Sequence, residues 1–594
     1  MKHIKSLVLA TVLGMSFTSC NDFLNLEPLN DIVLENFWTD KSDVESVLMG
    51  AYSALQSNDC LTRMVVWGEM RSDNMVEGSN TNEDARQILR ENLLITNGFT
   101  KYNAFYTAIN RANTVLYFAP IVAEKDPNYL VDELLAHKAE AIAIRCLCYW
   151  YLIRAYHDVP YVTQPSIDDE GGHMKFYVPQ SSFEDILDSL INDLESVKIR
   201  ANNKYATDDA NVCRFTRSAI CAMLADMYLW RGNADDWDKC IAVCEEITDQ
   251  KMKDWEKLRN KQGKSCTISA FNGYPLISDA PDDYPGNSYN EIFAEGYSFE
   301  SLFEFPYNND VKNTFVFGDQ QQRIEPYYQN SSSSSNNSVG QVKAFDNIGS
   351  AFGKKDNVFE QQTDVRYFTD LAKRGTSYGI TKYAFGSVRL SFSDGTLIFY
   401  STPSISSRGY CNWLVYRYSE ALLFEAEAYV MKAKALNPAG DDSIAVSMTQ
   451  KEYKDKAFRL IDAVNQRSVL ADNSKSKAID LATFTNYNTN GMTVSELEEL
   501  LFKERRRELM FEGKRWFDLV RMARRDGNQE RLLRYVEKKY DAATLSAVKI
   551  KLKNPYAMYF PLHKDEVRNS QGVLKQNPAY KDEEKNEQAS HSSH

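Results

Sequence analysis

The residues with the clearest potential for chemistry are three carboxylates spaced four apart, Glu504, Glu508 and Glu512, in a segment that also holds Arg507 and Arg515. A pair of carboxylates can hydrolyse a glycosidic bond when one of them has a raised pKa and acts as the acid. Here every carboxylate has an arginine within about two helical turns, and such a neighbour lowers the pKa of an acid. Spacings of three and four let opposite charges pair on one helix face. We therefore predict a structural ion network.

Motifs of other enzyme classes are absent from the sequence. It holds no GxSxG, no P-loop, no Rossmann glycine pattern, no HExxH and no CxxC. One turn-rich stretch offers oxygen ligands for calcium, but without the spacing of a known calcium loop; its residues are Asp282, Asp283, Asn287, Asn290 and Glu291. We expect an acidic loop there, no metal site and no cofactor, with a structural calcium as the alternative.

The ten cysteines form no recognisable metal or disulfide pattern. Cys146 and Cys148 lie in an apolar, helix-like stretch, and so do Cys240 and Cys244. Residues two apart on a helix face different sides, so the first pair does not suit a shared metal. Free cysteine behaves as a small hydrophobic residue, and we expect buried thiols.

The N-terminus reads as a lipoprotein signal. Lys2 and Lys5 precede an apolar run over residues 7–17, which is too short to span a bilayer and suits a signal-peptide core. The run ends in Phe17-Thr18-Ser19-Cys20, with small residues just before a cysteine. We predict cleavage after Ser19, acylation of Cys20, and a tether over residues 20–30 that anchors the chain through lipid alone. An ordinary secretory signal with a chance cysteine is the alternative.

Charge narrows the ligand class. The chain has a formal net charge of −13, and loss of Lys2 and Lys5 with the leader makes the mature protein two units more negative. Binding to nucleic acid relies on clustered Lys and Arg against phosphates, so this balance argues against a nucleic-acid partner. It argues in the same way against a polyanionic glycan, and neutral ligands fit best. Beyond the leader, no stretch of the length and apolarity of a membrane span occurs.

Helical periodicity dominates residues 31–264. Apolar residues recur at helical spacing over 43–52 and 105–116, and the stretch 131–156 has almost no helix breaker before Pro160. Ser182 is placed to cap a further helix. Helical patterning returns at Leu414 and again over 495–524.

Some predicted helices form pairs. Residues 215–230 and 237–247 read as helix–turn–helix, and 417–435 and 453–469 read the same way across Pro438 and Gly440. Small residues at the expected crossings favour degenerate tetratricopeptide-type units, with generic helical hairpins as the alternative.

The character of the chain changes over residues 265–412, where Pro, Gly, Asn, Ser and Tyr dominate. This composition is typical of loops and short strands. We expect a loop-rich insertion between the helical regions 31–264 and 413–594, with residues 31–594 as one compact domain. Loops held by a rigid framework commonly carry binding sites.

Four segments resemble one protein family. Residues 503–521, Lys-Glu-Arg-Arg-Arg-Glu-Leu-Met-Phe-Glu-Gly-Lys-Arg-Trp-Phe-Asp-Leu-Val-Arg, are similar to the C-terminal hallmark of the SusD/RagB family of outer-membrane nutrient-binding lipoproteins. Residues 151–161 and 417–428 resemble other family segments, in the expected order, and 576–580 resembles the closing motif. The resemblance covers essentially the whole mature chain.

The resemblance implies a mainly α-helical SusD-like fold, in which tetratricopeptide-like helix pairs support a loop-rich ligand face. It also implies a cell-surface lipoprotein of the outer membrane that binds an oligosaccharide or polysaccharide. The partner would be a SusC-like TonB-dependent transporter barrel that receives the ligand, and the protein itself would not be an enzyme. A peptide or glycopeptide ligand on the same fold is the first alternative. A glycoside hydrolase is the second.

Sugars are held by aromatic rings against their C–H faces and by polar side chains at their hydroxyls. Residues 65–74 resemble a segment near the glycan site of some family members, which makes Asp73 and Asn74 candidate ligand contacts. Trp67 is a weaker candidate because core packing suits it as well. An aromatic and amide-rich stretch and a predicted hairpin around Asp394 supply the remaining candidates, Phe317, Arg323, Tyr327, Tyr328, Arg389 and Tyr400.

Overall fold

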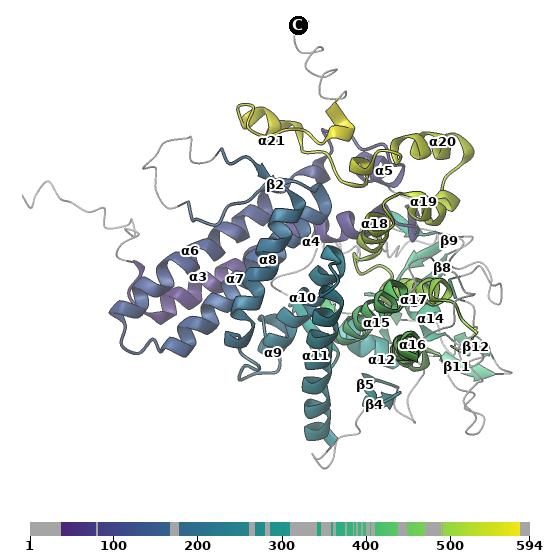
Figure 1. Ribbon diagram of the computed structural model, residues 1–594, viewed down its shortest axis with the longest axis horizontal. Coiled ribbons are helices and arrows are strands. Elements are labelled where there is room, and N and C mark those ends of the chain that lie inside the picture. Colours follow the sequence, from purple (N-terminus) through teal and green to yellow (C-terminus); the bar gives the residue numbers. More distant parts are fainter. Residues whose placement is uncertain are drawn as a thin grey trace, which may run out of the picture.

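The computed structural model describes residues 37–581 apart from a set of internal stretches (Figure 1). Those stretches are 79–80, 167–176, 260–267, 280–285, 309, 311–340, 346–347, 349–357, 360–363, 375–376, 384, 388–389, 394–395, 400–403, 406–409, 437–447, 470–488 and 490. Residues 1–36 also lie outside the description, and with them the predicted leader, Cys20 and the tether.

Four helices pack side by side in the N-terminal part: α3 (Lys41–Leu55), α6 (Asn103–Lys125), α7 (Val131–Tyr156) and α8 (Phe183–Val197). Each packs against the next, and Figure 1 shows the four helices side by side. The hydroxyl of Ser182 accepts a hydrogen bond from the backbone N–H of Asp185, so it caps α8. The helices predicted in this part of the sequence, and the Ser182 cap, are confirmed.

Two helical pairs continue the array. They consist of α10 (Arg217–Arg231) with α11 (Asp236–Arg259), and α15 (Tyr418–Ala435) with α16 (Met448–Ser468). α11 packs against α15 and joins the two pairs. Gly232, at φ 69°, ends α10 in the left-handed conformation that glycine adopts without a steric penalty. Both predicted pairs are confirmed, while the predicted turn at Pro438 lies outside the described residues.

The hallmark segment forms two helices, α17 (Val494–Leu509) and α18 (Arg515–Asp526). The predicted helical patterning over 495–524 is confirmed on both sides of residues 510–514, where the helix breaks. Phe511 and Gly513 have φ values of 67° and 72°, which a right-handed helix does not accommodate. The break redirects the chain, and residues on its two sides no longer share one helix face.

Three short helices follow α18 and form the upper part of the molecule in Figure 1: α19 (Glu530–Val536), α20 (Ala542–Lys551) and α21 (Lys564–Asn569). Phe560, between α20 and α21, donates its backbone N–H to the carbonyl of Ala155 at the end of α7, 2.7 Å away. The C-terminal segment is thereby joined to the N-terminal helices.

The strands are short and antiparallel. The largest sheet has the order β1-β7-β9-β8 and consists of β1 (Met75–Glu77), β7 (Val342–Ala344), β9 (Ser377–Ile380) and β8 (Leu371–Arg374). The strand pairs are β2 (Val159–Pro160) with β3 (Gln180–Ser181), β4 (Ile268–Phe271) with β5 (Tyr274–Ile277), β6 (Ser301–Phe305) with β14 (Trp413–Arg417), β10 (Phe385–Ser387) with β13 (Ser404–Ile405), and β11 (Leu390–Ser393) with β12 (Thr396–Phe399).

Short strands within 265–412 are as predicted, but the predicted return of helix at Leu414 is wrong. Leu414 lies in β14, and α15 begins four residues later at Tyr418. Aromatic and β-branched residues of the run Trp413–Arg417 pack well on a pleated surface, which explains the strand.

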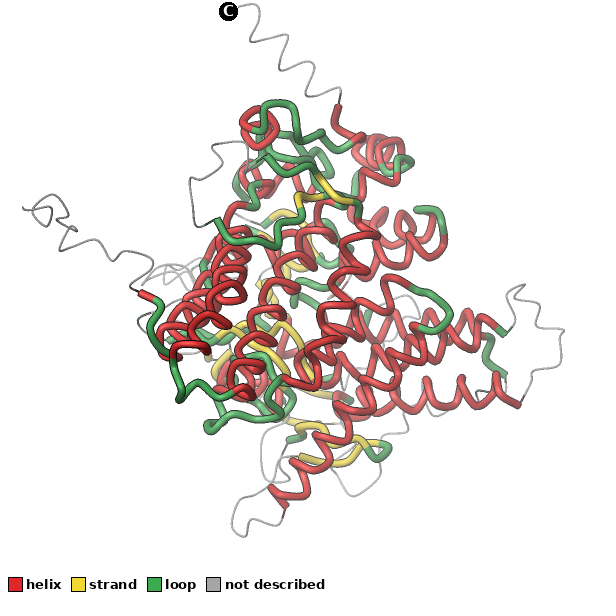
Figure 2. Tube along the Cα trace, turned by 60° about the vertical axis from the view of Figure 1, so that its left-hand side comes forward, coloured by secondary structure: helices red, strands yellow, loops and turns green. Residues whose placement is uncertain are grey.

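Figure 2 shows helices as the dominant element of the molecule, with strands confined to small areas. Short helical elements connect the longer helices and the strands. These short elements are α4 (Asn58–Val65), η2 (Val66–Met70), α5 (Glu83–Leu89), η3 (Gly98–Thr100), η5 (Lys198–Arg200), α9 (Ala210–Cys213), α12 (Asn287–Asn290), η6 (Glu291–Glu295), α14 (Val365–Asp370), η7 (Glu537–Lys539), η8 (Pro555–Met558) and η9 (Pro578–Tyr580).

One hydrophobic cluster contains buried side chains from all three sequence regions, among them Trp150, Phe303 and Trp516. Phe303 of β6 stacks on Phe215, just before α10, with ring centroids 4.1 Å apart, so the loop-rich region shares the helical core. Eight cysteines fall within the described residues and are free; all but Cys213 are buried, as predicted. Among the described helices, none has the length and apolar character needed to cross a bilayer.

Candidate functional site

The carboxylates that first suggest chemistry lie inside the protein. Glu504 and Glu508 are carried by α17, which starts at a capping box on Thr493, and Glu512 lies in the break after it. All three side chains are buried, with at most 3% of the residue exposed. A buried carboxylate needs paired cations and hydrogen bonds to offset its lost hydration.

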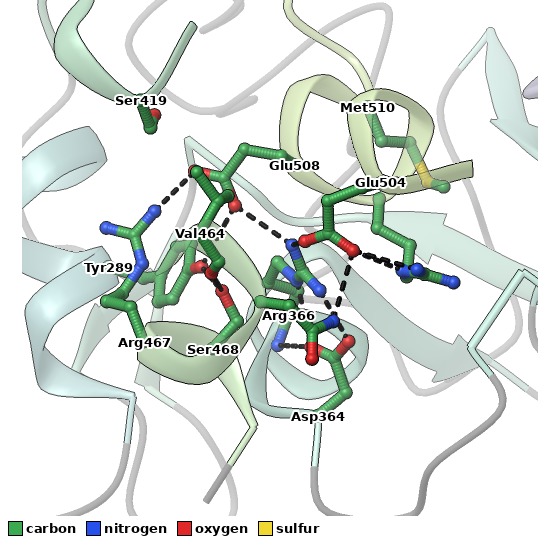
Figure 3. Close-up of polar contacts among 12 residues, drawn as sticks. Tyr289, Asp364, Arg366, Ser419, Val464, Arg467, Ser468, Glu504, Glu508 and Met510 are labelled. Carbon is green, nitrogen blue, oxygen red and sulfur yellow. Dashed lines mark hydrogen bonds and ion pairs between the residues drawn. The ribbon is translucent and has the colours of Figure 1, made fainter. Parts of the chain in front are cut away.

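Glu508 receives three arginines from three different segments. Arg417, at the end of β14, lies 2.5 Å from it, Arg366 of α14 lies 3.0 Å away, and Arg467 of α16 completes the set. Figure 3 shows Arg366 and Arg467 approaching Glu508 from opposite sides. Burial alone raises the pKa of Glu508, but the three guanidinium groups outweigh it and hold the pKa well below its usual range.

The two flanking carboxylates are paired in the same way. Glu504 contacts Arg366 at 2.7 Å and Arg507 at 2.8 Å, and Glu512 contacts Arg417 at 2.9 Å and Lys382 at 2.8 Å. Burial raises their pKa values, and these cations lower them further than burial raises them. The predicted structural ion network is confirmed.

The partners within that network differ from the prediction in one respect. Arg515 pairs with neither Glu508 nor Glu512, because the break at residues 510–514 places it on a separate helix. It instead holds Asp73, with Nε 2.8 Å from Oδ1 and Nη2 3.1 Å from Oδ2. A second arginine, Arg506, lies 3.0 Å from the same carboxylate. Asp73 is 2% exposed.

This arrangement corrects the predicted ligand role of Asp73 and Asn74. Both side chains are buried, and their polar atoms are used within the protein: Asn74 accepts a hydrogen bond from Arg506 at 2.7 Å and donates one to Glu69 at 2.8 Å. A side chain that meets a ligand needs accessible polar atoms. These two residues instead fasten the segment after η2 to α17 and α18.

Trp67 is likewise a core residue, as its alternative reading proposed. It is fully buried, its ring stacks on Phe105 at 5.1 Å, and its indole N–H donates to the carbonyl of Phe99 at 2.9 Å. Stacking of a ligand on this ring would require the core to open.

Glu69 connects η2 to the break at residues 510–514 of the hallmark segment. Its carboxylate accepts hydrogen bonds from the backbone N–H groups of Phe511 and Lys514, both at 3.1 Å. The chains approach so closely here that a Cβ atom on Gly68 would overlap the carbonyl of Gly513. Burial raises the pKa of Glu69 to about 6, although these donors lower it. The hallmark sequence therefore folds onto η2.

The segment directly after η2 also contacts the loop-rich region. Directly after Asn74, β1 pairs with β7, with Met75 opposite Ala344, and Asn74 accepts a hydrogen bond from the backbone N–H of Phe345 at 2.8 Å. β7 follows residues 311–340 in the sequence. Asp73 and Asn74 thus lie next to the strand pairing that joins β7 to the segment after η2.

The other candidate ligand residues lie outside the described residues: Phe317, Arg323, Tyr327, Tyr328, Arg389 and Tyr400. The hairpin predicted around Asp394 is confirmed by its flanking strands, because β11 pairs with β12 and Ser393 lies opposite Thr396. Ligand contact by these six residues stays a prediction.

Several described carboxyl groups have raised pKa values, and three of them reach about 6 or more, a range that suits an acid catalyst. Burial, as the largest cause, raises the pKa of Glu69 and Asp370 to about 6 and that of Glu425 to about 8. All three are buried, at 4% exposure or less, so none of them faces a surface-bound polysaccharide. Within the described residues no group of three metal-ligating side chains occurs. Asp282 and Asp283 of the weak calcium candidate lie outside them.

The sequence of this chain is similar to those of known proteins. Residues 279–580 match the sequence model of the SusD family, and residues 22–229 match a model described as starch-binding associating with outer membrane. The chain belongs to the SusD family. Two relatives of this SusD-family protein are SusD-like proteins P38 and P2 of Formosa agariphila, 24% and 20% identical. Those alignments cover 88% and 86% of this chain and 92% and 89% of the relatives.

Solved structures agree on the fold. A SusD superfamily protein from Bacteroides vulgatus superposes with a TM-score of 0.61 at 19% identity, covering 91% of this chain and all of the other. A laminarin-binding SusD-like protein superposes with a TM-score of 0.56 at 18% identity, again over 91% of this chain and all of the other. The predicted SusD-like, mainly helical fold is confirmed.

Sequence reasoning missed the cations that complete the ion network. Arg366, Lys382 and Arg467 are each far from the hallmark in the sequence. The available signal was an imbalance: three buried acids on one segment require more positive charge than Arg507 alone supplies. The sequence does not show which distant cations meet that need.

Proposed function

We propose that this SusD-family protein captures an extracellular oligosaccharide or polysaccharide at the cell surface and delivers it to a partner TonB-dependent transporter barrel. The observation that carries the proposal is the match of residues 22–229 to a model described as starch-binding associating with outer membrane. The laminarin-binding relative of the same fold adds support for a glycan ligand. The protein would bind and release its ligand without cleaving it.

The framework suits this task. The Asp73–Arg515 pair fastens the residues that lead into β1, and β1 pairs with β7 of the loop-rich region. Capture would then fall to the loop side chains, with Phe317, Tyr327, Tyr328 and Tyr400 against sugar faces and Arg323 and Arg389 at hydroxyl groups. Such contacts are shallow and individually modest, about 1–3 kcal/mol by analogy with bases stacked on aromatic rings. Modest affinity permits release toward a transporter.

Anchoring would come from Cys20. Cleavage after Ser19 and acylation of this cysteine would hold the protein at the outer membrane without a spanning segment, since each buried methylene contributes about 0.8 kcal/mol. Fractionation of cells that express Cys20→Ala tests this point. The variant should appear in the soluble fraction, and retention of an unmodified N-terminus in membranes would contradict lipid anchoring.

A glycan microarray, read beside peptide and glycopeptide pools on the same slide, tests the ligand class. The soluble chain from residue 21 should bind one or a few neutral glycans, and a Tyr327→Ala/Tyr328→Ala variant should bind them weakly. The Tyr117→Ala variant is the matched control, because Tyr117 is an exposed tyrosine of α6. Binding to peptides alone would replace the glycan proposal with peptide capture.

A further inference from the structure

A cavity of about 310 Å³ lies between α6 and the C-terminal α21, closed on its sides by residues 160–166 and 177–178. In Figure 1, α21 and β2 lie near the top of the molecule, above α6. The described residues that line it belong to the N-terminal and C-terminal regions, and none of them is a candidate capture residue.

Part of its polar lining is used to build the wall. The Tyr106 hydroxyl donates to the carbonyl of Pro160 at 2.7 Å, and the Asn113 side chain donates to the carbonyl of Val162 at 3.1 Å. The backbone N–H of Ser166 donates to the side-chain oxygen of Asn110 at 2.8 Å. These bonds hold residues 160–166 against α6, so this wall of the cavity is fastened to the helix.

A second set of polar groups is unused. Within the described residues, the side chains of Glu566 and Asn569 on α21 form no hydrogen bond or ion pair, and the Tyr102 and Tyr177 hydroxyls form none. Glu566 and Asn569 are three apart and lie on one helix face. Burial and the neighbouring Asp565 raise the pKa of the half-buried Glu566, and Lys101 opposes them.

These groups define a ligand class. Three tyrosine rings, from Tyr102, Tyr106 and Tyr177, offer flat apolar surfaces, while a carboxyl group and an amide offer hydrogen-bond acceptors and a donor. A sugar ring presents C–H faces to the former and hydroxyls to the latter. The acidic pair Asp565 and Glu566 disfavours uronic acids and sulfated sugars. The volume is at the lower end of the range for small-molecule sites.

We propose that this cavity is a second saccharide-binding site, which takes one or two neutral sugar rings and is independent of the loop-rich region. Tyr177 would pack on a sugar face, and Glu566 and Asn569 would bind its hydroxyls. The inference rests on the proposed function for its ligand class alone. A site of this size would hold the end of a chain or a short oligosaccharide.

Saturation-transfer NMR and calorimetry test the proposal with the soluble chain from residue 21 and a panel of neutral mono- and disaccharides of glucose, galactose, mannose and N-acetylglucosamine. At least one should bind the wild type. Tyr177→Ala and Glu566→Gln should each weaken it roughly fivefold or more, without lowering the melting temperature. Glucuronic acid should bind less well than glucose.

Matched controls separate this site from the capture region. Tyr117→Ala and Glu124→Gln change exposed residues of α6 outside the cavity and should leave short-sugar affinity unchanged. Tyr327→Ala/Tyr328→Ala should also leave it unchanged. Binding that Tyr327→Ala/Tyr328→Ala abolishes but both cavity variants retain would overturn the second site. Polysaccharide binding without any short-sugar binding would overturn it while the proposed function stands, and absence of both would overturn the two together.

Discussion

Asp73 and Arg515 are 442 residues apart in the sequence and form a buried two-point ion pair, with contacts of 2.8 and 3.1 Å. The pair joins the segment beneath the loop-rich region to the hallmark helix α18. An acid that looks like a ligand contact in the sequence is therefore a structural fastener. The hallmark segment of the SusD family, in this chain, fastens the residues that lead directly into β1.

Asp73→Ala should lower the free energy of unfolding by about 3–5 kcal/mol, because it leaves the buried Arg515 without its paired carboxylate. Urea denaturation followed by circular dichroism measures the change. Asp208→Ala is the control, since Asp208 is exposed and pairs with no cation in the described part of the chain. An unchanged midpoint together with lost glycan binding would return Asp73 to the ligand site.

Arg417→Met should be similarly destabilising, by about 3–5 kcal/mol, since Arg417 is 1% exposed and serves both Glu508 and Glu512. Guanidinium denaturation provides the measurement. Arg534→Met, at an exposed arginine of α19, should change stability by less than about 0.5 kcal/mol. Equal effects of the two variants would mean that the network contributes nothing beyond a general loss of charge.

Acid should destabilise the protein through the same network. The folded pKa values of Asp73, Glu508 and Glu512 lie below the ordinary values of 3.8 for Asp and 4.5 for Glu. Their stabilisation is complete above about pH 4.5, where the unfolded chain is also ionised, and is lost as pH falls through the lowered values. Glu69 and Asp370, at about 6, act in the opposite sense and reduce stability as pH rises toward 6.

Melting temperatures between pH 3 and pH 6 measure this dependence. The wild type should lose stability steeply below about pH 4. Arg417→Met should lose less over the same interval, because it removes one of the cations that lower the pKa values of Glu508 and Glu512. Parallel curves for the two proteins would show that other groups govern acid unfolding.

Gly68→Ala should prevent stable folding or lower the melting temperature severely, because its Cβ would overlap the backbone carbonyl of Gly513. Gly50→Ala is the matched control. Gly50 lies within α3, where a Cβ would meet nothing closer than 3.9 Å, and alanine there should stabilise the helix by about 0.5–1 kcal/mol. Differential scanning calorimetry compares the two, and equal melting temperatures would contradict the close approach of η2 and the hallmark break.

The local sequence pattern predicted the helices correctly where nearby residues determine their bounds. The stretch 131–156 lacks breakers and stops before Pro160, and α7 has those bounds. The break at residues 510–514 was not predicted, because its cause is remote: Glu69 binds the backbone of the break, and Gly68 packs against Gly513. The helix predicted at Leu414 was wrong because the composition of residues 413–417 also suits a strand, and the pairing with β6 that selects the strand is remote in the sequence.

The contacts of the candidate site were likewise only partly predictable from the sequence. Burial and pairing of Glu504, Glu508 and Glu512 followed from charge spacing and from the cost of an isolated buried acid. The identity of Arg366 and Arg467 did not follow, because sequence spacing carries no information on contacts between distant segments. The ligand role predicted for Asp73 was wrong because a polar residue before a loop can contact either a ligand or a buried arginine. The sequence does not show which of the two it contacts.

Size-exclusion chromatography with light scattering, on the soluble chain incubated for a long period with a polysaccharide identified by the microarray, tests the central claim most directly. Capture without chemistry predicts that protein co-elutes with the polysaccharide, that Tyr327→Ala/Tyr328→Ala reduces this co-elution, and that the molar mass of the recovered polysaccharide is unchanged. Shortened chains would make the protein a hydrolase, and absence of co-elution for every polysaccharide that the microarray reports would contradict glycan capture.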